Sequence, residues 1–168
     1  MKDFRIELRW GIIFSLLTMI LGFVEKMFLG WHDQHIDQQL GNHFLLLLTL
    51  FFIVFYLGIR EKRNTYYKGK LTWKQGIVSG GAMAVIIAIL SPLSVFFIYH
   101  YISPDYFSNM IDYQIHKENF PMPEQGARDF FSMSSYIILE ISTDLSFGIG
   151  AAAILSLFLR TSKSKKSH

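Results

Sequence analysis

The sequence has no cysteine among its 168 residues, so it offers neither a disulfide framework nor thiolate chemistry. It also lacks the short motifs that mark common enzymes: G-x-S-x-G, H-E-x-x-H, the P-loop and the glycine-rich dinucleotide turn. Ser79 precedes two glycines, but we expect no base near it at its depth in a membrane. From these absences we expect neither an enzyme nor a bound cofactor.

Hydrophobic sequence is abundant, because hydrophobic residues make up 51% of the chain and 16 residues are Phe. These residues are clustered in blocks long enough to cross a bilayer. The length leaves room for one membrane domain and for no separate soluble domain of typical size. We therefore predict an all-α bundle of four transmembrane helices in a single domain, residues 1–168. The helices are expected at about residues 10–29, 44–59, 73–101 and 136–159.

Basic residues gather between the second and third apolar blocks, in residues 60–74 (REKRNTYYKGKLTWK). Six lysines and arginines stand there against one acid, Glu61, and the tail after Leu159 is also basic. Because short loops rich in Lys and Arg stay in the cytoplasm, we expect a multi-pass membrane protein with both termini cytoplasmic. The net charge of +3 then reflects segments that face lipid headgroups, and no nucleic-acid partner is predicted.

Small residues recur every four positions in the third predicted helix. They are Gly76, Gly80, Ala84 and Ala88. A similar series in the fourth helix consists of Glu140, Asp144, Gly148, Ala152 and Ser156. Because small residues let two helix backbones approach closely, we predict that these stripes pack against each other. Pro92 lies inside the third helix and predicts a kink near Ser91.

The connection between the third and fourth helices, about residues 104–131, is the only long one. Ser103 has a side chain suited to capping a helix, and Pro104 suits the first helical position. The residues that follow place an apolar face on one side: Phe107, Met110, Ile111, Gln114 and Ile115. We therefore expect an amphipathic helical cap on the outer side, over the bundle or on the membrane surface, broken by Pro121 and Pro123.

Each of the four helices has a polar residue at a similar depth, ~24–26 Å from the cytoplasmic face. The depth is counted at ~1.5 Å per residue from the basic residue at the cytoplasmic end of each helix. At this depth lie Glu25, His43, Ser91 and Asp144, with Lys26 and Ser94 close to the same level and Glu140 about one turn further out. We call these seven residues the predicted polar layer. Charges at such a depth are costly when they face lipid, so they should face the bundle interior or water. Three interpretations stay open. Lys26 pairs with Glu140 or Asp144 and fixes the helix register, or the layer is an outward-opening pocket for a small ligand, ion or proton, or the charges lie at helix ends and have no role.

Four residues after the first helix are of types that bind metals: His32, Asp33, His35 and Asp37. The two histidines have a suitable spacing. Histidines in wet loops are commoner than metal ligands, however, so these four are weak candidates and no metal is predicted.

Several blocks of the sequence resemble a known family. They are Trp10-Gly11, Glu25-Lys26, His32-Asp33, YKGKLTWKQGIVSG (67–80), Leu90-Ser91-Pro92 and YISPDYF (101–107). These blocks are similar to the domain-of-unknown-function family forty-one ninety-nine, small inner-membrane proteins of Bacteroidota-type bacteria. The resemblance implies a four-helix inner-membrane protein, and it implies no activity and no catalytic residues.

Two functions follow from this reading. The first is a structural or accessory membrane component, which would have the lipid bilayer and a homo-oligomer or another membrane protein as partners. The alternative is a small transporter, or a membrane protein that binds a ligand or ion in the acidic polar layer.

Overall fold

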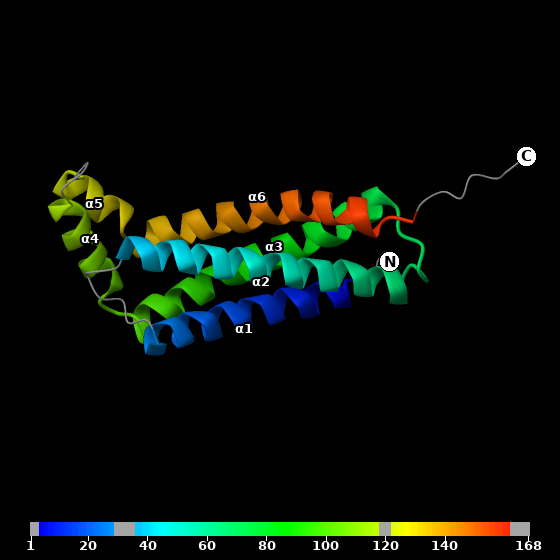
Figure 1. Cartoon of the computed structure of the whole chain (residues 1–168), viewed down its shortest axis with the longest axis horizontal. Helices are drawn as coiled ribbons and strands as arrows, with labels where there is room; N and C mark the ends of the chain where they lie inside the picture. The colour runs from blue at the N-terminus through cyan, green and yellow to red at the C-terminus, as the bar shows by residue number, and fades with distance from the viewer. Residues whose placement is uncertain (1–3, 29–35, 118–121, 162–168) are drawn as a thin grey trace, which may run out of the picture.

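The computed structural model describes residues 4–28, 36–117 and 122–161, and these residues are almost entirely helical. Four long helices lie side by side, and two short helices lie across one end of them (Figure 1). In chain order the elements are α1 (Arg5–Phe28), α2 (Ile36–Thr65), α3 (Trp73–Phe97), the π-helical turn η2 (Ile98–Ile102), α4 (Tyr106–His116), α5 (Glu124–Phe130) and α6 (Met133–Leu159). The predicted all-α, four-helix architecture is confirmed. We call the two ends of the bundle the α4–α5 end and the α2–α3 end, the latter after the loop that joins those helices.

Each long helix contains a stretch that is long and apolar enough to cross a membrane. The four stretches are Arg5–Phe28, His43–Thr65, Trp73–Ile102 and Met133–Leu159. Large apolar side chains also cover the outside of the bundle, such as Ile89 and Leu93 of α3, which are 70% and 62% exposed. An exposed apolar surface of this kind is suited to lipid. The chain is therefore a multi-pass membrane protein.

Two helices are longer than predicted at the α2–α3 end. α1 begins at Arg5, and α2 continues through the basic residues to Thr65. The prediction ended each helix where the apolar run ends, but that point marks the edge of the membrane and not the end of the helix. Glu, Lys and Arg are good helix formers, so α2 extends past the lipid. Pro92 lies inside α3, which continues to Phe97.

α3 and α6 form the most extensive helix pair of the bundle. A Cβ atom added to Gly80 would lie 2.3 Å from the Cβ of Ala152, and one added to Gly148 would lie 2.4 Å from the Cβ of Ala84. A step of four residues forward along α3 thus matches a step of four residues back along α6. The two helices are antiparallel, and the predicted pairing of their small-residue stripes is confirmed.

Local hydrogen bonds hold the α2–α3 end together. Thr72 and Gln75 form a capping box at the start of α3, in which each side chain accepts a hydrogen bond from the other residue's backbone N–H, at 2.8 and 3.3 Å. The backbone N–H of Thr161, just after α6, donates to the carbonyl oxygen of Leu71 at 2.8 Å. The N–H of Leu71 donates to the Thr161 hydroxyl at 3.0 Å. The end of α6 is therefore bonded to the loop that precedes α3.

A separate apolar cluster holds α4 and α5 against the opposite end of the bundle. Its buried members are Tyr106, Met110, Ala127 and Phe131, and they pack against partly buried rings that include Tyr99 and Tyr136. The hydroxyls of Tyr106 and Tyr136 lie 3.1 Å apart. Burial raises the pKa of Tyr106 further above its ordinary value. The predicted apolar face of α4 therefore packs over the end of the bundle.

The prediction that the Ser103 side chain caps α4 is wrong. Ser103 ends η2, where its backbone N–H donates to the carbonyl oxygen of Ile98 at 2.7 Å. α4 begins only at Tyr106, and Asp105 precedes it without a side-chain capping bond. The π-helical turn at the end of α3 shifts the start of the next helix, which frees the Ser103 hydroxyl from a capping role.

Candidate ligand-binding cavity

A cavity of about 420 Å³ lies between the four long helices, from the middle of the bundle toward the α4–α5 end. Its walls come from α1, α2, α3, η2 and α6, and about half of the lining residues have apolar side chains. The aromatic ones are Phe14, Phe44, Phe51, Tyr99 and Phe147. Small-molecule sites in proteins typically measure ~300–1,000 Å³, so this cavity has the size of a binding site.

Six of the seven residues of the predicted polar layer line this cavity. They are Glu25, His43, Ser91, Ser94, Glu140 and Asp144. The seventh, Lys26, is exposed and is not part of the lining. In the described ranges no ion pair joins Lys26 to Glu140 or Asp144. Consecutive helix residues point ~100° apart, so the burial of Glu25 turns Lys26 outward.

Glu25 is the most buried carboxyl group of the cavity, at 3% exposure. Its Oε2 lies 2.6 Å from Nδ1 of His43, which links α1 to the first part of α2. Its Oε1 is buried and has no hydrogen-bond partner among the residues that the structure describes. Leaving a buried acceptor unpaired costs about 1–3 kcal/mol, and more for a charged group. Glu25 therefore contributes a carboxyl group to the cavity lining, and one oxygen of that group is buried without a partner in the described part of the chain.

Asp144 and Glu140 lie one turn apart on α6 and continue its small-residue stripe toward the α4–α5 end. Asp144 is buried at 6% exposure, and Glu140 is partly buried. On the facing helix, the Ser91 hydroxyl donates to the carbonyl oxygen of Ala88 at 3.1 Å. The stripes that bring α3 and α6 together thus end in two carboxyl groups that face the cavity.

Two more lining residues carry buried atoms without partners. The hydroxyl oxygens of Ser94 and Ser103 join Oε1 of Glu25 in this group, and the fourth such atom in the described part of the chain is Oγ of Ser156. Ser94 and Ser103 are 7% and 3% exposed. Buried polar groups are usually hydrogen-bonded, so three unpaired ones around a single cavity are unusual. Ser94 was predicted as a site residue, whereas Ser103 was not, because it was assigned to a helix cap.

The weak metal candidates of the sequence fall outside what the structure describes. His32, Asp33 and His35 lie outside the described residues, and the side chain of Asp37 does so as well. Among the described residues, no group of three or more His, Asp or Glu side chains could hold a metal ion.

Comparison with protein families adds the chain's relationship. A family model described as "Protein of unknown function (DUF4199)" matches residues 9–161. The chain belongs to the DUF4199 family. The match runs from Arg9 in α1 to Thr161, two residues after the end of α6, so it includes the whole cavity. Neither the curated proteins nor the solved structures give a match.

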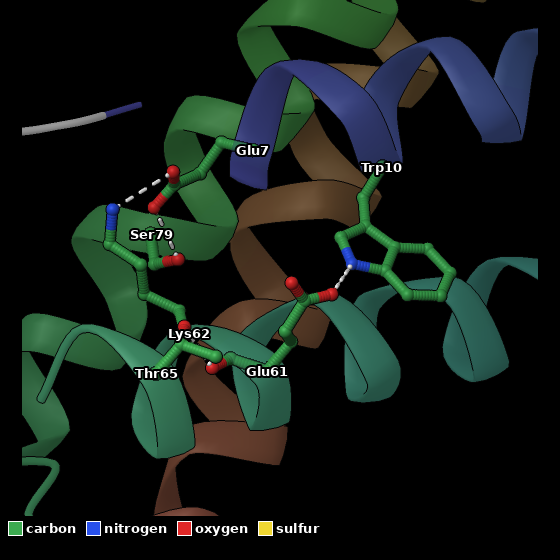
Figure 2. A network of polar contacts seen from close by, with 6 residues as sticks. All are labelled: Glu7, Trp10, Glu61, Lys62, Thr65 and Ser79. Atoms are coloured by element: carbon green, nitrogen blue, oxygen red, sulfur yellow. Dashed lines mark hydrogen bonds and ion pairs between the residues drawn. The ribbon is translucent and has the colours of Figure 1, made fainter. Parts of the chain in front are cut away.

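This DUF4199 protein has a second polar cluster, at the α2–α3 end, that the sequence did not predict. Glu7 is buried at 1% exposure, and its Oε2 lies 3.1 Å from Nζ of Lys62, which is also buried (Figure 2). The hydroxyl of Ser79 donates to Oε1 of Glu7 at 2.7 Å. The expectation that Ser79 has no base near it is therefore wrong. Because both carboxylate oxygens are paired and buried, this cluster joins α1, α2 and α3 as part of the core.

A neighbouring interaction joins α1 and α2 nearer the surface. The indole N–H of Trp10 donates to Oε2 of Glu61 at 2.9 Å (Figure 2). Arg9 forms an ion pair with the same carboxylate oxygen. The sequence analysis interpreted the charges around Glu61 only as markers of the cytoplasmic side. In this protein, Glu61 also fixes how α1 and α2 meet.

Proposed function

We propose that this DUF4199 protein binds a small ligand within the membrane, in the cavity between α1, α2, α3 and α6. The supporting observation is that, of the four unpaired buried side-chain atoms in the described part of the chain, three belong to residues that line this one cavity: Glu25, Ser94 and Ser103. Unpaired acceptors and donors that gather around an apolar cavity are suited to a bound molecule. The proposal is binding, and it includes no catalytic step.

A purely structural component is the other function that the sequence leaves open. The arrangement of the cavity argues against it, because unpaired buried groups destabilise a fold that only has to hold together. The elements that stabilise the bundle lie elsewhere, in the α3–α6 contact and in the pair of Glu7 and Lys62. The cavity therefore favours ligand binding over a scaffold role.

We also propose that the protein lies in the bacterial inner membrane with both termini in the cytoplasm. Exposed basic residues support this orientation, because they gather at the α2–α3 end: Arg60, Lys68, Lys70, Lys74 and Arg160. Positive charge in short loops keeps them cytoplasmic. The α4–α5 end then faces outward, and the cavity lies in the outer part of the membrane. Labelling of the cavity from outside intact cells distinguishes this orientation from its reverse.

Filling the cavity is expected to abolish ligand binding. Ser94 lines the cavity, and Ser94→Trp would place a large ring in it. A compound at ~100 times its dissociation constant stabilises a protein by about 2.7 kcal/mol, which raises the melting temperature by several degrees. We expect a thermal-shift screen with the purified protein in detergent to find such compounds for the natural chain and not for Ser94→Trp.

Ile89→Trp is the matched control, since Ile89 lies on the same helix and is 70% exposed. It should respond to compounds as the natural chain does. Ser91→Phe fills the cavity with a smaller ring, in case Ser94→Trp does not fold. A set of compounds that stabilises the natural chain and both filled variants equally would refute the proposal, as would a screen without any stabilising compound.

A further inference from the structure

We infer that the ligand of this cavity is an amphipathic organic cation, with an apolar or aromatic body and a protonated amine. The inference rests on the proposed function and adds the chemical class of the ligand. It follows from three properties of the cavity: its charge, the composition of its walls and its unpaired polar atoms.

The charge of the lining favours a cation. Three carboxyl groups line the cavity, from Glu25, Glu140 and Asp144, and the lining contains no Lys or Arg. The one histidine, His43, faces the Oε2 of Glu25. Carboxylates within a membrane are stabilised by a positive group close to them, and an unpaired buried charge is strongly unfavourable. A cationic ligand supplies that group, whereas an anionic ligand would be repelled.

The walls favour an organic cation over a metal ion. Apart from the carboxyl groups, the cavity is lined mainly by apolar side chains, including Phe14, Phe51 and Phe147. A volume of about 420 Å³ is far larger than a dehydrated metal ion needs. Within the described ranges, the carboxyl groups and His43 do not form a group that could hold a metal. An apolar or aromatic body fills this space, and the aromatic rings also attract a cation.

The unpaired atoms favour an amine that carries hydrogen. When Glu25 is ionised, its Oε1 can accept a hydrogen bond but cannot donate one. The hydroxyls of Ser94 and Ser103 can accept as well as donate. A primary or secondary ammonium group donates two or three hydrogen bonds, and those to a carboxylate are of the strong, charge-assisted kind. A quaternary ammonium group has no such donor. Glu25 is therefore expected to contact the amine.

Three probes with the same apolar body test this inference: 4-phenylbutylammonium, 4-phenylbutanol and 4-phenylbutanoate. The purified protein is placed in nanodiscs of phosphatidylcholine, and dissociation constants are obtained from the concentration dependence of the melting temperature. We expect the dissociation constant of the ammonium probe to be at least about tenfold lower than that of the alcohol, because the ammonium group adds a charge-assisted hydrogen bond. The anionic probe should not bind.

Glu25→Gln should remove most of the difference between the dissociation constants of the ammonium probe and of the alcohol. Asp144→Asn is a second variant, in case Glu25→Gln disturbs the contact with His43. Asp112→Asn is the control, because Asp112 lies on α4 with a side chain that is 76% exposed. It should leave all three dissociation constants unchanged.

The outcomes separate this inference from the proposed function. Equal binding of the alcohol and the ammonium probe, or tighter binding of the anion, would overturn the inference and leave ligand binding in place. So would a stabilising effect of Zn²⁺ or Mg²⁺ that is lost in Glu25→Gln. The inference and the proposed function fail together if none of the three probes binds and the screen finds no compound whose stabilising effect is lost in Ser94→Trp.

Discussion

Replacing Lys62 with methionine is expected to lower the free energy of unfolding by about 3–5 kcal/mol. The reason is that Glu7 would remain buried at 1% exposure without the ammonium group that lies 3.1 Å from its Oε2. The hydrogen bond from Ser79 would persist, but it does not balance a full charge. Equilibrium unfolding by SDS in mixed micelles, followed by far-ultraviolet circular dichroism, measures this change.

Two controls isolate the ion pair. The double variant Glu7→Leu with Lys62→Met replaces both charges by apolar groups, and it should recover much of the lost stability. Lys68→Met removes an exposed charge near the same end of α2 and should change stability by less than ~0.5 kcal/mol. If Lys62→Met unfolds at the same SDS concentration as Lys68→Met, the pair does not stabilise the bundle as described.

Replacing Gly80 with isoleucine should destabilise the protein by about 3 kcal/mol, because a side chain at this position forces α3 and α6 apart. Even the first carbon of that side chain would lie 2.3 Å from the Cβ and 3.2 Å from the Cα of Ala152. The backbone atom cannot move without shifting the whole helix. The same unfolding assay measures the loss.

Gly81 provides the matched control one residue later. A Cβ added to Gly81 meets no atom within 4 Å, so Gly81→Ile adds an apolar side chain without a clash. Its stability should stay close to that of the natural chain. Equal destabilisation by the two variants would mean that isoleucine harms the helix itself and that the close α3–α6 contact is not the cause.

The α3–α6 contact could be predicted from the sequence because its requirement is local and periodic. Close approach of two helices needs small residues on one face of each, and the four-residue spacing places them there. The depth of the polar layer could also be predicted. Helix rise per residue is nearly constant, so counting from basic anchors on four helices brings Glu25, His43 and Asp144 to one level.

Lys26 shows what such counting omits. Depth along a helix axis says nothing about direction around it, and Lys26 shares the depth of Glu25 while pointing outward. The spacing of Gly22 and Glu25, which are both buried on α1, indicates the inward face. Which polar residues meet therefore depends on the face of the helix that each residue occupies, as well as on its depth.

The Glu7–Lys62 pair was missed because both residues were assigned to the aqueous side of the membrane. On α2, however, Ile59 lies four residues after Phe55 and Lys62 lies three residues after Ile59, so Lys62 continues the buried face of that helix. Glu7 precedes Gly11 on α1 in the same way. This helical spacing was present in the sequence, and it would have indicated that two opposite charges are directed into the core.

The place of Ser103 in the cavity lining could not be predicted from the sequence. Ser103 follows a π-helical turn at the end of α3, and α4 starts only at Tyr106. A serine followed by proline and aspartate fits a helix cap equally well. Only the arrangement of the neighbouring helices shows that its hydroxyl has no partner among the described residues.

The central claim is that the acidic layer lines a cavity that small molecules reach from outside the cell. The absence of cysteine allows a direct measurement, because a single introduced cysteine is the only thiol in the chain. Ser94→Cys places it in the cavity, Ile89→Cys in the lipid-facing surface and Ser79→Cys in the sealed cluster with Glu7. Each variant is treated in intact cells with a membrane-impermeant trimethylammonium thiosulfonate, which reacts with the thiolate that forms in water. We predict that only Ser94→Cys is labelled, and labelling of Ser94→Cys no faster than Ile89→Cys would contradict the account.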